Sequence, residues 1–129
     1  MKVLLDSCTL LRLELEPAKI PSGLLNLLQN RETERYFSAA SVWEITVKWM
    51  SGKLKLPVPP AQFLAESRQR GRIASLPIDE SAVVQLIKLP KLHTDPFDRM
   101  LVCQAIEHGM AIATPDELIE QYPVRTVWR

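Results

Sequence analysis

The stretch from His93 to Arg99, HTDPFDR in one-letter code, holds the densest group of chemically useful side chains in the sequence. Asp95 and Asp98 stand three residues apart at the expected start of a helix, and residues at this spacing lie on one helical face. The apolar run over residues 100–106 predicts a buried helix behind them. Both carboxylates can therefore be held rigidly at its exposed amino end.

Three further acids, Asp6, Glu44 and Asp116, come shortly after apolar runs that read as strands. In open α/β sheets, ligand sites form at the carboxyl ends of the strands. We therefore expect these three acids at one edge of a sheet. Asp98 is expected to join them less directly, because its helix follows a loop and not an obvious strand.

Four carboxylates at one edge repel one another and raise their own pKa values. A divalent cation relieves this repulsion, and a ligand set made only of oxygen suits Mg²⁺ or Mn²⁺. Zinc is disfavoured because no His/Cys cluster has the spacing of a zinc site, and His93 and His108 stand alone. A site of this kind is suited to metal-dependent hydrolysis of phosphodiester bonds.

Several polar side chains close to the acids are candidates for supporting roles. The hydroxyls of Ser7 and Thr114 can position water or phosphate, although Thr114 is equally an expected helix N-cap. Arg99 can contact a substrate phosphate or pair with a neighbouring acid, and the sequence does not separate these roles.

Helix capping is the competing explanation for each acid taken singly. Ser41 and Glu44 have the spacing of a capping box, in which Glu44 would only satisfy a backbone amide. Asp95 precedes a proline and reads as an N-cap, and Asp98 then occupies the third helical position, which favours a carboxylate. Asp6 fits this explanation least well, since it ends an apolar strand.

The composition predicts one soluble globular domain spanning residues 1–129. The chain is 47% hydrophobic and 24% charged, and its net charge of +1 gives no polybasic sign of a nucleic-acid partner. Two cysteines make no disulfide framework, and no run is long enough for a signal peptide or a membrane span. We expect a cytoplasmic protein that does not associate with a membrane.

Strand-like and helix-like segments alternate along the chain, and hairpin signals are missing. This pattern predicts an α/β fold, with a parallel sheet of four or five strands and helices on both faces. In the helix expected over residues 79–88, Asp79 is the N-cap and Val83, Val84 and Ile87 should point inward. Strands are expected over residues 3–5, 36–40, 73–76, 110–114 and 124–128. Helices are expected over residues 10–13, 24–29, 41–50, 61–69, 79–88, 95–108 and 115–122.

The acidic segments together resemble a known family. Residues 4–7 (LLDS), 40–45 (ASVWEI), 93–99 (HTDPFDR) and 114–116 (TPD) are similar to the four acidic motifs of PIN-domain ribonucleases. Within that family they resemble the VapC-like toxins of bacterial and archaeal toxin–antitoxin pairs. The likeness runs over residues 2–128, and the order and spacing of the motifs carry it.

The resemblance implies Asp6, Glu44 and Asp98 as the core metal ligands, Asp116 as the fourth acid and Asp95 as a supporting acid. It also implies a PIN-like three-layer α/β/α fold and Mg²⁺ or Mn²⁺ as the cofactor. An RNA substrate, a homodimer and an antitoxin protein whose tail blocks the acidic pocket are the implied partners.

Three other readings remain open. A haloacid-dehalogenase-like phosphatase has a nucleophile loop that residues 6–9 (DSCT) partly imitate, but that loop needs a second Asp where Cys8 stands. A receiver-like signalling domain needs a pair of acids after the first strand, where only Asp6 is present. A catalytically degenerate PIN-like binding module is the non-enzymatic alternative, and the presence of all four acids argues against it.

Overall fold

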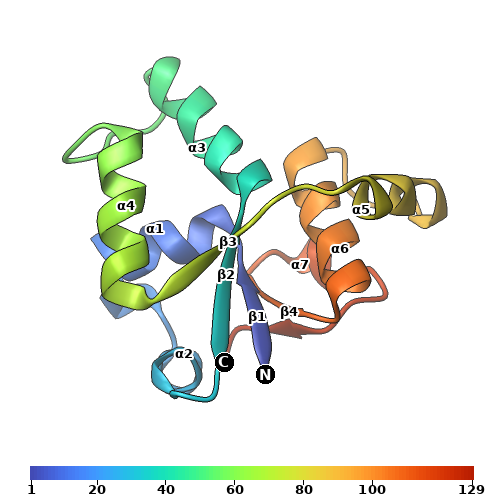
Figure 1. Cartoon of the computed structure of the whole chain (residues 1–129), viewed down its shortest axis with the longest axis horizontal. Coiled ribbons are helices and arrows are strands. Elements are labelled where there is room, and N and C mark those ends of the chain that lie inside the picture. Colours follow the sequence, from blue (N-terminus) through green and yellow to red (C-terminus); the bar gives the residue numbers. More distant parts are fainter.

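The computed structural model describes all residues, 1–129, and has a five-stranded sheet at its centre (Figure 1). The strands are β1 (Lys2–Leu5), β2 (Glu34–Ser38), β3 (Ile73–Leu76), β4 (Ala111–Ala113) and β5 (Thr126–Val127). Their order in the sheet is β3-β2-β1-β4-β5, and every neighbouring pair is parallel. The chain runs outward from β1 to β3 and then returns to the other side of β1, so the topological switch point lies between β1 and β4.

Seven α-helices and two short 3-10 turns connect the strands. The helices are α1 (Ser7–Leu15), α2 (Ser22–Gln29), α3 (Ala39–Met50), α4 (Pro60–Gly71), α5 (Glu80–Val84), α6 (Pro96–His108) and α7 (Glu117–Glu120). The 3-10 turns span Pro17–Lys19 and Gln85–Lys88. None of the helices has the length and apolar character that crossing a membrane would require.

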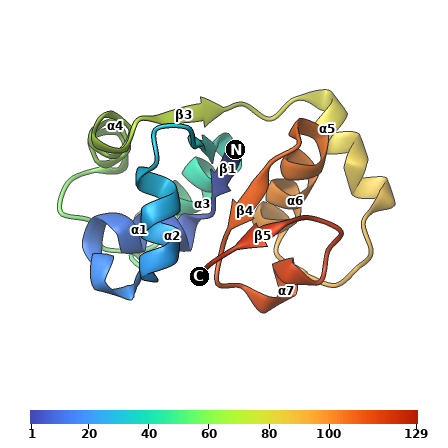
Figure 2. The same ribbon diagram turned by 90° about the horizontal axis from the view of Figure 1, so that it is seen from below.

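The alternation of side chains along β1 divides the core into two halves. Successive residues of a strand point to opposite faces, so Val3 and Leu5 enter one half and Leu4 the other. Helices α1, α2 and α4 cover the first face, and α5, α6 and α7 cover the second (Figure 2). The predicted three-layer α/β/α architecture with a parallel sheet is confirmed.

Helix α3 lies at the carboxyl edge of the sheet and packs against α1, α4 and α6, which belong to both outer layers (Figure 1). It begins at Ala39, earlier than the predicted Ser41, because the hydroxyl of Ser38 accepts a hydrogen bond from the Ala40 amide and caps the helix. The expected strand over residues 36–40 therefore ends at Ser38. Ser41 is buried, and its hydroxyl has no hydrogen-bond partner.

The predicted inward face of the helix after Asp79 is wrong. Asp79 is the N-cap, but Val83, Val84 and Ile87 are 41%, 59% and 87% exposed. Ala82 lies on the face of α5 that is buried against α6, and Val83 and Val84 follow it in the same α-helix at steps of about 100°, so they point away from that face. Ile87 lies in the 3-10 turn that follows α5.

The last two predicted elements are shorter in the structure. The helix expected over residues 115–122 is α7, which covers four residues, and the closing strand β5 covers two of the residues expected over 124–128. Asp116, and not Thr114, is the N-cap of α7, because its carboxylate accepts a hydrogen bond from the Leu118 amide at 2.8 Å.

Candidate metal centre

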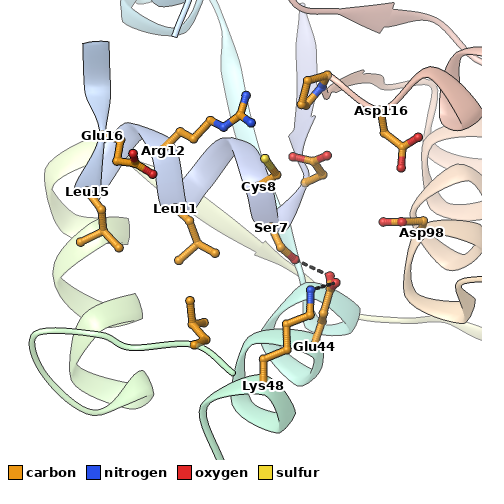
Figure 3. Close-up of a pocket in the computed structure, with 13 residues that line it drawn as sticks. Ser7, Cys8, Leu11, Arg12, Leu15, Glu16, Glu44, Lys48, Asp98 and Asp116 are labelled. Carbon is orange, nitrogen blue, oxygen red and sulfur yellow. Dashed lines mark hydrogen bonds and ion pairs between the residues drawn. The ribbon is translucent and has the colours of Figure 1, made fainter. Parts of the chain in front are cut away.

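Four of the five acids identified from the sequence line a single open cavity of about 590 Å³ at the carboxyl edge of the sheet (Figure 3). Each comes from a different connection. Asp6 follows β1, Glu44 lies in α3, Asp98 lies in the first turn of α6, and Asp116 follows β4. The topology thus brings together four carboxylates that lie between positions 6 and 116 of the sequence.

Asp6 is held by hydrogen bonds to both of its carboxylate oxygens. Oδ1 accepts from the Thr9 amide at 2.7 Å, so Asp6 is the N-cap of α1, contrary to the sequence-based expectation that it fits a capping role least. Oδ2 accepts from the hydroxyl of Thr114 at 2.5 Å. Burial raises the pKa of Asp6, and the hydrogen bonds from Thr114 and Thr9 oppose that rise. Capping and a place in the cavity are therefore compatible for this residue.

Glu44 has no capping role. Ser38 caps α3, and the side chain of Glu44 points into the cavity, where Oε1 accepts from the hydroxyl of Ser7 at 2.6 Å. Its other oxygen, Oε2, is 2.9 Å from the ammonium of Lys48 one helical turn away (Figure 3). The hydrogen bond to Glu44 raises the pKa of Lys48. The capping-box interpretation of Glu44 is wrong, since the helix begins two residues before Ser41.

Asp95 and Asp98 both lie at the amino end of α6, but Asp95 caps the helix whereas Asp98 lines the cavity. Asp95 Oδ1 accepts from the amides of Phe97 at 2.8 Å and Asp98 at 3.3 Å, so the predicted N-cap is confirmed, and Asp95 does not line the cavity. The Asp98 side chain does line it. Burial, followed by the negative charges of Asp95 and Glu44, raises the pKa of Asp98 to about 7.

Asp116 divides its two oxygens between the helix and the cavity. Oδ1 caps α7, and Oδ2 lies 3.0 Å from Nε2 of His93. The same Nε2 is 3.1 Å from Asp98 Oδ2, and the nitrogen and the two carboxylate oxygens all lie within 4.8 Å of one another. The sequence interpretation missed His93, although it stands in the same short stretch as Asp98, because an isolated histidine shows no ligand spacing.

The two predicted hydroxyls and Arg99 have structural partners. The Ser7 and Thr114 hydroxyls donate to Glu44 and Asp6, and Thr114 Oγ1 also accepts from the Asp116 amide at 3.0 Å, so both residues orient acids. Arg99 lies outside the cavity and pairs with no acid. Its Nη1 donates to the Pro90 carbonyl at 3.1 Å and to a tyrosine hydroxyl at 3.2 Å.

The charge balance of the cavity favours a bound cation. Five carboxylates line it, including that of Glu16, against the two cationic side chains Arg12 and Lys48. The raised pKa values of Asp6 and Asp98 reflect carboxylates that are buried with too little positive charge around them. Carboxylate oxygens from several elements are the donor set that Mg²⁺ and Mn²⁺ take in proteins, so the residues present fit such an ion.

The family resemblance implied Asp6, Glu44 and Asp98 as the core ligands, but the closest group of possible ligand atoms in the structure is a different one. This group contains Asp98 and Asp116 together with His93, whereas Asp6 and Glu44 line the same cavity outside it. Asp98 and Asp116 are therefore the carboxylates best placed to share one ion, and Asp6 and Glu44 are placed to add further oxygens.

Comparison with known proteins agrees with this architecture. The family model described as "PIN domain" matches residues 3–124, which is nearly the whole chain. No curated protein matches the chain.

Three of the solved structures that share this fold are those of VapBC2, VapBC-1 and FitAcB. The chain is 14% identical to one in VapBC2 from Rickettsia felis, bound to a DNA fragment from their promoter, with a TM-score of 0.78 and complete coverage of both chains. For VapBC-1 from nontypeable Haemophilus influenzae the identity is 13%, the TM-score is 0.65, and the coverage is 98% of this chain and 97% of the other. For FitAcB from Neisseria gonorrhoeae the identity is 22%, the TM-score is 0.56, and the coverage is 96% and 95%. At these identities the similarity shows the shared fold.

Proposed function

Because this chain belongs to the PIN domain family, we propose that it is a metal-dependent endoribonuclease that hydrolyses RNA phosphodiester bonds with Mg²⁺ or Mn²⁺. One observation carries this proposal. Asp6, Glu44, Asp98 and Asp116, from four separate parts of the chain, line one cavity that contains too few cationic groups to balance them. A phosphodiester is an anion, so it approaches such a site only when cations are present.

In this proposal Asp98 and Asp116 hold the cation, and Asp6 and Glu44 complete its oxygen ligands. A bound divalent cation lowers the pKa of a water molecule to produce the nucleophile and neutralises charge on the phosphate. Thr114, through its hydrogen bond to Asp6, fixes the orientation of that acid, as the Ser7 hydroxyl does for Glu44.

The two cationic side chains of the cavity are suited to binding RNA. The Arg12 guanidinium lies over the ring of Trp128, 5.5 Å from its centroid, and Lys48 projects from α3 beside Glu44 (Figure 3). Both can contact the phosphates on either side of the scissile bond, because a nucleic-acid backbone is bound mainly by Lys and Arg.

The biological role that we propose is that of the toxin in a toxin–antitoxin pair, acting in the cytoplasm as a homodimer. The support is the fold shared with chains of VapBC2, VapBC-1 and FitAcB, together with the family resemblance of the acidic motifs. A cognate antitoxin protein would then be the main partner. A basic segment of that partner fits the excess of carboxylates in the cavity.

The direct test is to incubate the purified chain with a mixed RNA pool and Mg²⁺ or Mn²⁺, with EDTA as the control. We expect cation-dependent cleavage, and sequencing of the fragment ends identifies the target. The matched variants are Asp98→Asn, which should lose this activity, and Asp79→Asn, which makes the same chemical change at a helix cap outside the cavity and should keep it. Metal binding without any RNA cleavage would contradict the nuclease and would favour a binding module with a PIN fold.

The partners need separate measurements. Sedimentation analysis of the purified chain should give the mass of a dimer, and a monomer would contradict the homodimer. A small reading frame directly upstream, encoding a protein that copurifies with this chain and suppresses its cleavage of RNA, is expected for the antitoxin. If that protein binds without affecting cleavage, the antitoxin role is wrong.

A further inference from the structure

The imidazole of His93 lies between two of the cavity's acids. Its side chain is 12% exposed, and its Nε2 is 3.1 Å from Asp98 Oδ2 and 3.0 Å from Asp116 Oδ2. No other side chain makes a hydrogen bond or ion pair with both of these carboxylates. The imidazole is therefore either a ligand of the same cation or a group that arranges the two acids.

The other ring nitrogen decides between these roles. The Asp95 backbone amide donates a hydrogen bond to His93 Nδ1 at 3.1 Å. A backbone N–H only donates, so Nδ1 must carry a lone pair and no proton. A neutral imidazole has one N–H, which must then be on Nε2. The group that faces Asp98 and Asp116 is consequently a hydrogen-bond donor and not a lone pair.

We propose that His93 is a positioning residue, which uses its Nε2–H to hold the carboxylates of Asp98 and Asp116 together so that they can share a divalent cation. This inference rests on the proposed metal-dependent function. Outer partners of this kind set the orientation of metal-binding carboxylates and affect the affinity of the ion without touching it.

The surroundings of His93 keep the ring in place. The backbone amide of His93 donates to the hydroxyl of Tyr122 at 2.8 Å, and Tyr122 is 3% exposed. Arg99 Nη1 donates to the same hydroxyl at 3.2 Å. Asp95 fixes the tautomer through its amide while its carboxylate caps α6. Asp95 and Arg99, which the sequence associated with the site, thus act on the cavity through His93.

A role as a ligand would require the structure to change. Nε2 can bind an ion only after losing its proton, and Nδ1 would then have to take up a proton and give up the hydrogen bond from the Asp95 amide. A nitrogen ligand would also move the preference of the site toward zinc, whereas a positioning role leaves a ligand set of oxygens. The two roles therefore make different predictions for substitutions and for spectra.

Two substitutions test the hydrogen bonds at Nδ1 and Nε2 of His93 separately. His93→Gln keeps an N–H donor near the position of Nε2, and His93→Asn keeps an acceptor near Nδ1 but loses the donor. We expect His93→Asn to weaken Mn²⁺ binding, measured by calorimetry, by about 10–100-fold, the usual effect of removing an outer partner. His93→Gln should bind close to the wild-type affinity. Equal affinity of His93→Asn and the wild type, or equal loss in both variants, would overturn the proposal.

A spectroscopic measurement on the unmodified protein avoids any folding defect in the variants. Long-range ¹H–¹⁵N NMR spectra should show a protonated Nε2 and a bare Nδ1 on His93 in the metal-free and the Mg²⁺-loaded protein. Electron spin-echo spectra of the Mn²⁺-loaded protein should lack a directly bound histidine nitrogen. Detection of that nitrogen would overturn the positioning role and leave the proposed nuclease intact. Failure of the wild type to bind Mn²⁺ would instead count against the proposed function itself.

Discussion

The acidic cavity and a pocket of arginines lie at opposite edges of the same sheet. Their charged side chains differ in burial and in the opposite charges around them. Arg31, Arg35, Arg70 and Arg72 line an open pocket of about 420 Å³ near the amino ends of β2 and β3. Arg35 Nη1 donates to the carbonyls of Leu28 and Asn30, and Arg70 pairs with Glu14. Arg31, Arg70 and Arg72 are exposed to solvent, whereas Arg35 is half-buried and its Nε has no hydrogen-bond partner.

Two carboxylates of the cavity, in contrast, are almost fully buried. Asp6 is 4% exposed and Glu44 6%, and short side chains on fixed elements cannot move apart. Burial and neighbouring negative charge raise the pKa of Asp98 to about 7. A cluster of like charge thus indicates a binding site when it is buried and has fewer opposite charges around it than it needs for balance. When most of the charges are exposed, as among the arginines, water screens them and no bound ion is needed.

The largest effect is expected from neutralising an acid of the cavity. Asp98→Asn should lower the rate of RNA cleavage by at least about 100-fold, because it removes a charged cation ligand while keeping the shape of the side chain. Initial rates at a fixed Mn²⁺ concentration measure this. Arg72→Ala, in the arginine pocket, is the control and should cleave at the wild-type rate. A similar loss in both variants would abolish the distinction between the two regions.

Cation binding should stabilise the folded chain, and this gain should depend on the acids of the cavity and not on the arginine pocket. With Mn²⁺ at about 100 times its dissociation constant, linkage gives about 2.7 kcal/mol of stability relative to EDTA, or a rise in Tm of about 10 °C for a domain of this size. Differential scanning fluorimetry measures the change. Asp98→Asn should lose most of the increment, while Arg35→Ala should keep it in full. An undiminished increment in Asp98→Asn would contradict the role of that acid.

The metal-free protein should lose stability as the pH rises. The pKa of Asp98 is about 7 in the folded chain and near 3.8 when unfolded, so between these values the folded state binds the extra proton. The stability that Asp98 contributes is complete at acid pH and is lost as the pH passes through about 7. We expect the free energy of unfolding to fall by on the order of 2 kcal/mol between pH 5 and pH 8. Denaturant melts in EDTA should show this fall in the wild type and a smaller one in Asp98→Asn.

The smallest effect is expected in the arginine pocket. Arg35→Ala removes the hydrogen bonds to the Leu28 and Asn30 carbonyls, which should cost about 1–2 kcal/mol of unfolding free energy. It should leave the affinity for Mn²⁺ unchanged. Urea denaturation and calorimetry together check both statements. If Arg35→Ala weakened Mn²⁺ binding, the two edges would be energetically coupled and the comparison would fail.

The sequence predicts the convergence of the acids well, because chain topology alone decides it. Alternating strands and helices place Asp6 and Asp116 after neighbouring strands of a parallel sheet, and the structure has β1 beside β4. The α/β class, the helix caps at Asp79 and Asp95 and the end of α6 at Gly109 also follow from local signals.

The contacts between side chains could not be predicted in this way. His93 meets Asp116 across 23 residues, and Ser7 meets Glu44 across 37, and neither pair has a spacing that marks it. The start of α3 was misplaced because Ser38 and Ser41 are equally good caps in the sequence, and only the length of β2 chooses between them. The exposure of Val83, Val84 and Ile87 could not be predicted either, because all three are apolar and only the packing of Ala82 against α6 decides which face is buried.

X-ray diffraction from crystals soaked in Mn²⁺, with data collected near the manganese absorption edge, tests the shared cation site most directly. The expected result is an anomalous peak in the cavity, within about 2.0–2.3 Å of carboxylate oxygens from Asp98 and at least one of Asp116, Asp6 and Glu44. The arginine pocket should show no peak. A cavity without anomalous density at saturating Mn²⁺, with each carboxylate still bound to its own chain, would contradict the metal centre.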